Sequence, residues 1–168
     1  MFNHIVKGGL CVAVAATGFL MQPADAGMSC WNQQRLAAAK VRDLQSRLMV
    51  ATMRCGAMGI NILPAYNEFV RSNRSTLQAA NGQIKAQFNQ GFGAGGQAEY
   101  DRFTTRLANA YGADATNSSI CQQTAARAQD AVAAGGDVEQ LLRIVDSMGP
   151  APTLPGGACK VSFAEASR

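Results

Sequence analysis

The chain has 168 residues, of which 48% are hydrophobic, 15% charged and 7% aromatic, and its formal net charge is +4. This length fits one domain, and the hydrophobic fraction excludes a wholly disordered protein. The one histidine is His4. A chain processed beyond it therefore lacks both the usual general base of hydrolases and the usual imidazole metal ligand.

The first residues predict a signal peptide over 1–26. Lys7 supplies a positive charge, and the apolar run Gly8–Met21 follows it. Ala24 and Ala26 then form the small-x-small pattern at which signal peptidases cut. The apolar run is too short to cross a bilayer of about 30 Å as a helix. We therefore expect a chain that is cut near Ala26, is periplasmic or secreted, and has no transmembrane segment.

Cysteine usage supports export. Cleavage would remove Cys11 and leave Cys30, Cys55, Cys121 and Cys159. An even number in an exported chain favours two disulfides, and zinc is disfavoured because no pair has C-x₂-C spacing. Three pairings are open. We favour Cys55–Cys121, which joins two apolar helix stripes, with Cys30–Cys159, which joins the chain ends.

The first predicted helix has Ser29 as its N-cap and runs to about Cys55, where Gly56 ends it. Its apolar residues follow steps of three and four, which is typical of a packed helix. A second helix is predicted from Pro64 to Phe88, with Asn73 lying on its apolar side.

The glycine run Gly91–Gly96 predicts a flexible connection to a third helix over 97–111, which Gly112 ends. Asn117 or Ser118 caps a fourth helix that contains Cys121, and Asp137 caps a fifth that ends near Met148.

These elements predict an all-α fold, an antiparallel bundle of four or five helices over 27–148. A proline- and glycine-rich tail over 149–168 follows, and we expect Cys159 to tether it. No alternating strand pattern interrupts the helices.

Few residues remain for catalysis, and we assign none. Glu99 and Asp101 flank Tyr100 near a helix start, where acidic side chains suit the helix dipole. The alternative to a non-enzymatic protein is a small cell-wall glycosidase that uses Glu99 or Glu68 as its general acid. The run Gly91–Gly96 matches G-x-G-x-x-G but lacks a preceding strand, so we expect no dinucleotide cofactor.

Three methionines surround the end of the first predicted helix: Met49, Met53 and Met58. Methionine usually fills gaps in cores, so we expect these side chains to be packed inside. The alternative is a Cu(I) site, since thioethers bind that ion. With core packing expected, no metal or other cofactor is assigned.

Basic residues concentrate in the first half of the chain. Arg35 and Arg42 are seven positions apart and share a helix face, as do Arg47 and Arg54. These arginines are the candidate binding residues for an anionic component of the cell envelope or for a protein partner. The competing interpretation is that the basic half packs against the acidic half. No basic cluster interleaved with aromatic residues indicates nucleic acid, and the oligomeric state is left open.

Several stretches carry a resemblance: Val41–Cys55, Tyr66–Val70, Tyr100–Tyr111 and Cys121. In these stretches the chain resembles a group of small exported alphaproteobacterial helical proteins, and the resemblance implies no activity. Similar chains sometimes bear the name adenosylhomocysteine hydrolase. The residues do not support that name, because that enzyme is a much larger cytoplasmic protein with a dinucleotide-binding domain.

Overall fold

The computed structural model describes residues 28–150 and 152–160, so the expected signal peptide over 1–26 lies outside the described residues. Within them the fold is all-α, as predicted, and the single β-type pairing is an isolated bridge between Trp31 and Ala158. The helices, with one 3₁₀ turn, are α1 (Gln33–Gly56), α2 (Leu63–Ser72), α3 (Arg74–Phe92), η1 (Gly93–Gly95), α4 (Gly96–Ala113), α5 (Ser118–Ala133) and α6 (Val138–Ser147).

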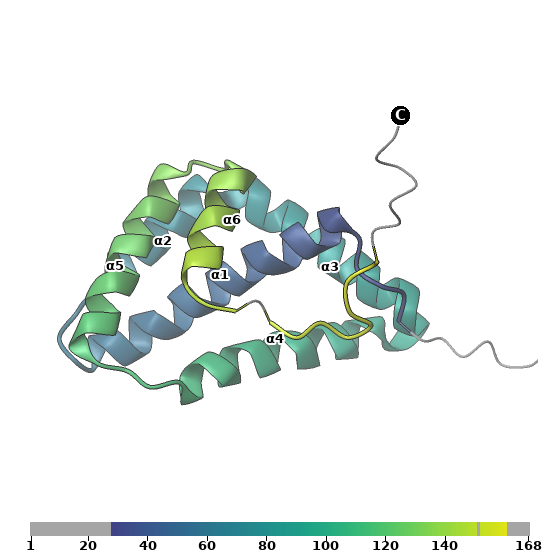
Figure 1. The fold of residues 1–168 in the computed structure, drawn as a ribbon, viewed down its shortest axis with the longest axis horizontal. Helices are drawn as coiled ribbons and strands as arrows, with labels where there is room; N and C mark the ends of the chain where they lie inside the picture. Colours follow the sequence, from purple (N-terminus) through teal and green to yellow (C-terminus); the bar gives the residue numbers. More distant parts are fainter. Residues whose placement is uncertain (1–27, 151, 161–168) are drawn as a thin grey trace, which may run out of the picture.

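Helix α1 is the centre of the bundle, and every other α-helix packs against it. In Figure 1 it crosses the middle of the molecule, with α4 along one edge and with α2, α5 and α6 gathered towards one end. Its large buried aliphatic residues include Val41, Leu44 and Leu48, which are three and four positions apart, as the sequence pattern predicts. Asn32 caps this helix by accepting a hydrogen bond from Arg35 N at 2.9 Å, so the prediction of Ser29 as the cap is wrong.

The predicted second helix is two helices, because the chain breaks at Asn73. This side chain is fully buried, and its Nδ2 donates to the carbonyl oxygens of Phe69 at 3.0 Å and Ala131 at 2.9 Å. Its Oδ1 accepts a hydrogen bond from Gly136 N at 2.7 Å. Asn73 therefore joins the α2–α3 junction to the α5–α6 turn, and a continuous helix over 64–88 is the wrong prediction.

The glycine run forms ordered helical structure. Gly93 to Gly95 make the 3₁₀ turn, and α4 begins directly at Gly96. Gly96 lies so close to α3 that an added Cβ would come within 2.6 Å of Asn89 Cα. A glycine is therefore needed where α4 folds back on α3. Helix α4 also runs past the predicted stop at Gly112 to Ala113.

The later helix caps follow the prediction. Asn117 Oδ1 accepts a hydrogen bond from Ile120 N at 2.9 Å, and Asp137 Oδ1 accepts one from Gln140 N at 3.1 Å. Each cap satisfies an N–H group that the first turn of a helix leaves without a partner.

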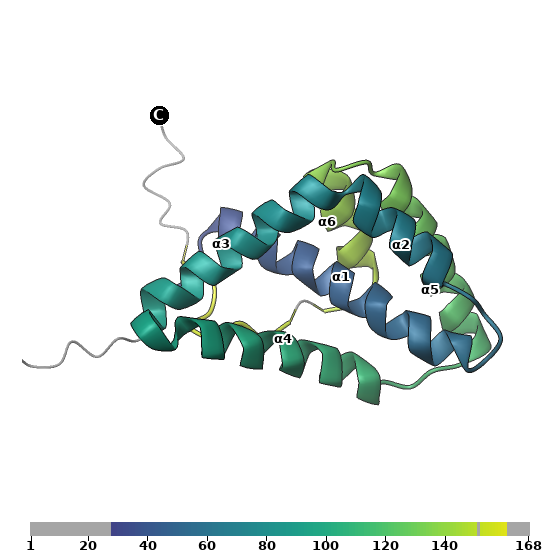
Figure 2. The ribbon, with the colours of Figure 1, turned by 180° about the vertical axis from the view of Figure 1, so that it is seen from behind.

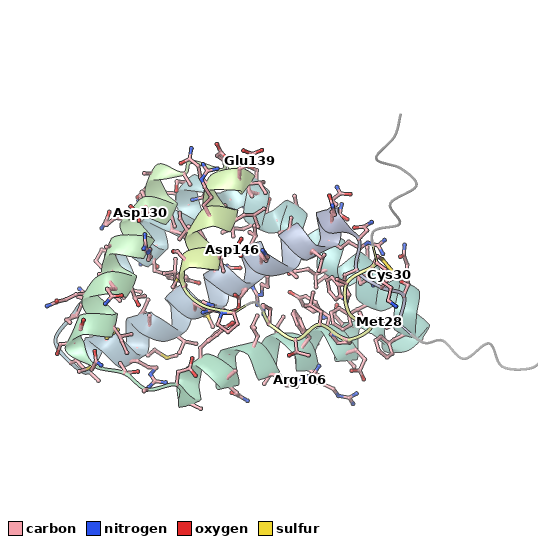
Figure 3. All side chains as sticks on the ribbon, in the orientation of Figure 1. Met28, Cys30, Arg106, Asp130, Glu139 and Asp146 are labelled. Carbon is pink, nitrogen blue, oxygen red and sulfur yellow. A yellow bond between two sulfur atoms is a disulfide. The ribbon has the colours of Figure 1, made fainter. Side chains whose placement is uncertain are left out.

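Both favoured disulfides are present. Cys55–Cys121 joins the end of α1 to α5 with a Cα–Cα distance of 5.5 Å, and Cys30–Cys159 joins the two ends of the described chain at 4.8 Å. The first bond lies in the core, because both of its cysteines are buried. The second lies at the end of the molecule where Figure 3 labels Cys30.

Residues 152–160 form what we call the C-terminal strap, which runs back along the bundle to Cys159. Trp31 holds it: its backbone N–H donates to Gly157 O at 2.8 Å, and its Nε1 donates to Pro155 O at 2.7 Å. The indole ring is completely buried and lies 5.9 Å from the ring of Phe88, centroid to centroid. One aromatic side chain therefore anchors the strap and fills the core.

Candidate anion-binding site

Arg47, a predicted binding residue, is engaged inside the bundle. Its Nε donates to Asp43 Oδ2 at 2.9 Å, and its guanidinium lies 4.5 Å from the ring centroid of Tyr111. Its terminal nitrogens donate to the carbonyl oxygens of Met148 at 2.8 Å and Pro150 at 2.6 Å. With 12% of its side chain exposed, Arg47 secures the end of α6.

Arg54 does the same for α4. Its guanidinium donates to the carbonyl oxygens of Tyr111 at 2.7 Å, Gly112 and Asp114, where α4 ends. The last carbonyl groups of a helix have no partner within the helix, and a cation at that end also complements the helix dipole. The predicted face of Arg47 and Arg54 therefore contacts other helices of the bundle.

The other predicted pair points towards α3. Arg35 donates to Gln87 Oε1, and the Nε2 of this fully buried glutamine donates to Ser29 O at 2.6 Å. Arg42 donates from Nη1 to Gln45 Oε1 at 2.8 Å. Arg47 and Arg54 line hollows beside α4, whereas Arg42 lines an open hollow with two further arginines from other helices.

That hollow, of about 460 Å³, lies between α1, α2 and α3. We call it the arginine pocket, after Arg42 of α1, Arg71 of α2 and Arg74 of α3, and no acidic side chain lines it. Figure 2 shows α1 passing below the angle that α2 and α3 make where they meet. The break at Asn73 sets this angle and so brings arginines from three helices to one site.

The charges of the arginine pocket are incompletely balanced. Arg71 pairs with Glu68, three positions earlier on α2, and no salt bridge between described residues includes Arg42 or Arg74. Arg42 Nε is buried and has no hydrogen-bond partner in the described chain. A buried donor without a partner is costly, and the two arginines without an ion-pair partner leave the pocket positively charged.

Comparison of the chain with protein-family models, with curated proteins and with solved structures gives no match.

The sequence indicated part of this site. The excess of basic residues in the first half of the chain and the spacing of Arg42 were visible in the sequence, but Arg71 and Arg74 were not among the predicted binding residues. Their signal was the same charge excess, carried by a second segment. Which arginines of α1 face that segment depends on how the helices pack, and no local spacing contains that information.

Two ionisable residues with raised pKa values, Asp43 and Tyr111, form a buried polar network between α1 and α4. Asp43 is completely buried, and it accepts hydrogen bonds from the Tyr111 hydroxyl and from Arg47 Nε. Burial raises the pKa of Asp43 above its usual value, against the lowering effect of Tyr111 and Arg47. Burial and then the Asp43 carboxyl raise the pKa of Tyr111. The network borders a groove of about 560 Å³ between α4 and the strap, which Arg47 and Tyr111 line.

The carboxylates considered for catalysis are not brought together. Glu68 pairs with Arg71 on α2, and Glu99 pairs with Arg102 on α4. Neither glutamate lines the arginine pocket or the groove beneath the strap. The glycosidase alternative therefore gains no pair of facing carboxylates, which such a mechanism needs.

The predicted core position of the methionines is wrong. Met49, Met53 and Met58 are 37%, 66% and 41% exposed. The neighbouring Leu48 and Cys55 take the core positions of α1, which leaves Met49 and Met53 on the outer side of that helix. Met58 lies in the turn after α1 has ended. For a Cu(I) site, the helix thus supplies two thioethers one turn apart.

Within the described residues, no group of three or more histidine, cysteine, aspartate and glutamate side chains is placed to hold a metal ion. In the same part of the chain, no helix is both long enough and apolar enough to cross a membrane.

Proposed function

We propose that this protein is a non-enzymatic, exported helical binding protein of the cell envelope, and that its arginine pocket receives an anionic envelope component. The observation that carries the proposal is the convergence of Arg42, Arg71 and Arg74 around one hollow, where neither Arg42 nor Arg74 has an ion-pair partner among the described residues. Guanidinium groups bind carboxylates and phosphates through paired, charge-assisted hydrogen bonds.

Two features support the exported location. The N-terminal segment has the charge, apolar run and cleavage pattern of a signal peptide. Four cysteines are joined in two disulfides, and such bonds persist in oxidising compartments.

The test is binding of the purified, disulfide-intact protein to isolated peptidoglycan and to lipopolysaccharide. We expect retention on at least one of them, weakening as salt is raised from about 50 mM to about 500 mM, because salt screens exposed charges. The double variant Arg71→Gln/Arg74→Gln should bind at least about tenfold more weakly, since each charged hydrogen bond contributes about 1.5–3 kcal/mol.

The matched control is Arg127→Gln/Arg143→Gln, which removes two arginines of α5 and α6 that also form ion pairs within their own helices. It lowers the net charge equally and should keep nearly full binding. Equal loss in both double variants would show attraction to net charge and would reject the pocket. Release of soluble fragments from peptidoglycan, abolished by Glu68→Gln or Glu99→Gln, would reject the non-enzymatic function.

A further inference from the structure

The lining of the arginine pocket contains more than charge. Four amide side chains stand among the arginines: Gln45, Asn67, Gln78 and Asn81. Arginines alone are enough to bind a simple anion. The amides therefore indicate a ligand with further polar groups.

The internal hydrogen bonds turn two of these amides into donors. Gln45 Oε1 accepts from Arg42 Nη1 at 2.8 Å, and Asn81 Oδ1 accepts from the Tyr100 hydroxyl. Their carbonyl oxygens are thus engaged, while their NH₂ groups have no partner among the described residues. Arginine has donors only. The pocket is therefore rich in donors and suits a ligand that is rich in acceptor oxygens.

The remaining lining is apolar and aliphatic, and it consists of Val70 and Leu77. It offers no aromatic ring, so the stacking platform on which nucleobases are bound is missing from this pocket. The volume of about 460 Å³ lies in the range of small-ligand sites. A ligand that matches all three features has an acid group, several hydroxyl or ether oxygens, and a C–H face.

We propose that the arginine pocket binds a short acidic saccharide. Its carboxylate or phosphate lies against Arg42, Arg71 and Arg74, its sugar oxygens accept hydrogen bonds from the amides, and its C–H face covers Val70 and Leu77. This inference rests on the proposed function, because it names the ligand class of the same site.

The experiment compares dianions with and without sugar rings by titration calorimetry on the oxidised protein. Digalacturonate should bind at least about tenfold more tightly than glutarate, since it adds several hydrogen bonds to the same charge. Glucose 6-phosphate against inorganic phosphate tests the phosphate source in the same way. Preference for the sugar in either pair supports the proposal. Maltose, a neutral sugar, should bind far more weakly than the preferred acid.

A variant separates the amides from the arginines. Asn67→Leu/Gln78→Met removes two exposed amides and keeps side chains of similar shape. It should weaken binding of the preferred acidic sugar by about tenfold, since hydrogen bonds are lost, while glutarate affinity changes less than about twofold. The control Asn109→Leu/Gln122→Met, at exposed positions of α4 and α5, should leave both affinities unchanged.

The outcomes are distinct. Equal affinity for sugar and simple anions in both pairs, or an equal loss of both in the amide variant, would overturn saccharide recognition and leave anion binding standing. Absence of binding by all of the acidic probes would overturn the proposed function together with this inference.

Discussion

Asp43 shows how one residue can couple the stability of this bundle to pH. Its carboxyl is completely buried between Tyr111 and Arg47, and burial opposes its ionisation. The pKa of Tyr111 is raised as well, because the residue is buried and because loss of its proton would place a second negative charge beside Asp43. Both groups therefore hold their protons more firmly in the folded chain than in the unfolded chain.

The raised pKa of Tyr111 predicts that Tyr111→Phe changes how stability falls at alkaline pH. A tyrosine ionises near pH 10 when unfolded, and the folded pKa of Tyr111 is higher. Its contribution is therefore complete below pH 10 and is lost as pH rises above it, by up to about 1.4 kcal/mol per pH unit. Urea unfolding at pH 8, 10 and 11 should show a flatter alkaline decline in the variant, although it starts about 1–3 kcal/mol less stable from the lost hydrogen bond. Parallel pH profiles would contradict the assignment.

Two glycines in neighbouring helices have opposite roles. Gly82 lies exposed in the middle of α3, and an added Cβ would meet nothing within 4 Å. Gly96 begins α4, and a Cβ there would come within 2.6 Å of Asn89 Cα and 2.8 Å of Asn89 N. The first glycine is a cost to the helix, and the second allows two helices to meet.

We therefore expect opposite effects of the same change. Gly82→Ala should raise the free energy of unfolding by about 0.5–1 kcal/mol, because alanine loses less conformational freedom in a helix. Gly96→Ala should lower it by about 1–3 kcal/mol, as overpacking does. Thermal and urea unfolding measure both. A neutral Gly96→Ala would show that α4 can shift away from α3 without loss.

At the level of elements, the sequence predicted those helix ends that depend on hydrogen bonds between neighbouring residues. The caps Asn117 and Asp137 bond within their own first turns, so sequence alone located them. The apolar stripe over 64–88 is equally continuous, yet the chain breaks there. Asn73 bonds to Ala131 O and Gly136 N, which are far along the sequence, and no local pattern contains those partners.

At the scale of the whole molecule, the strap joins the two ends of the described chain. Its detachment should be measurable by the fluorescence of one residue. Trp31 is the one tryptophan, and it is buried beneath the strap. Cys30→Ser/Cys159→Ser opens a loop with a sequence separation of 129, which should lower stability by about 2–5 kcal/mol. It should also shift Trp31 fluorescence to the red as the strap detaches.

The control is Cys55→Ala/Cys121→Ala, which removes the core bond and leaves the strap attached. We expect a loss of stability with unchanged Trp31 emission from the folded protein. If opening the Cys30–Cys159 bond left the emission unchanged, the hydrogen bonds of Trp31 would suffice to hold the strap.

At this scale the sequence predicted the bundle and the favoured cysteine pairing. Both depend on helix length and amphipathic spacing, which the chain carries throughout. It did not predict that Arg47 and Arg54 would receive the carbonyl ends of α6 and α4, or that Arg42 would meet Arg71 and Arg74. Those contacts depend on how whole helices lie against one another.

The nested pattern of the two disulfides has a consequence for biosynthesis. A ribosome delivers Cys30 and Cys55 before either of their partners exists, so the earliest bond among the four paired cysteines would be a non-native one between them. Cys30 precedes α1 and Cys55 lies at its far end, and the 24 residues of this helix span about 36 Å, far beyond the roughly 7 Å limit of a disulfide. If α1 forms before oxidation, the nascent chain keeps both thiols apart until Cys121 and Cys159 have been synthesised. This excludes one of the two non-native pairings, Cys30–Cys55 with Cys121–Cys159, before the native bonds can form.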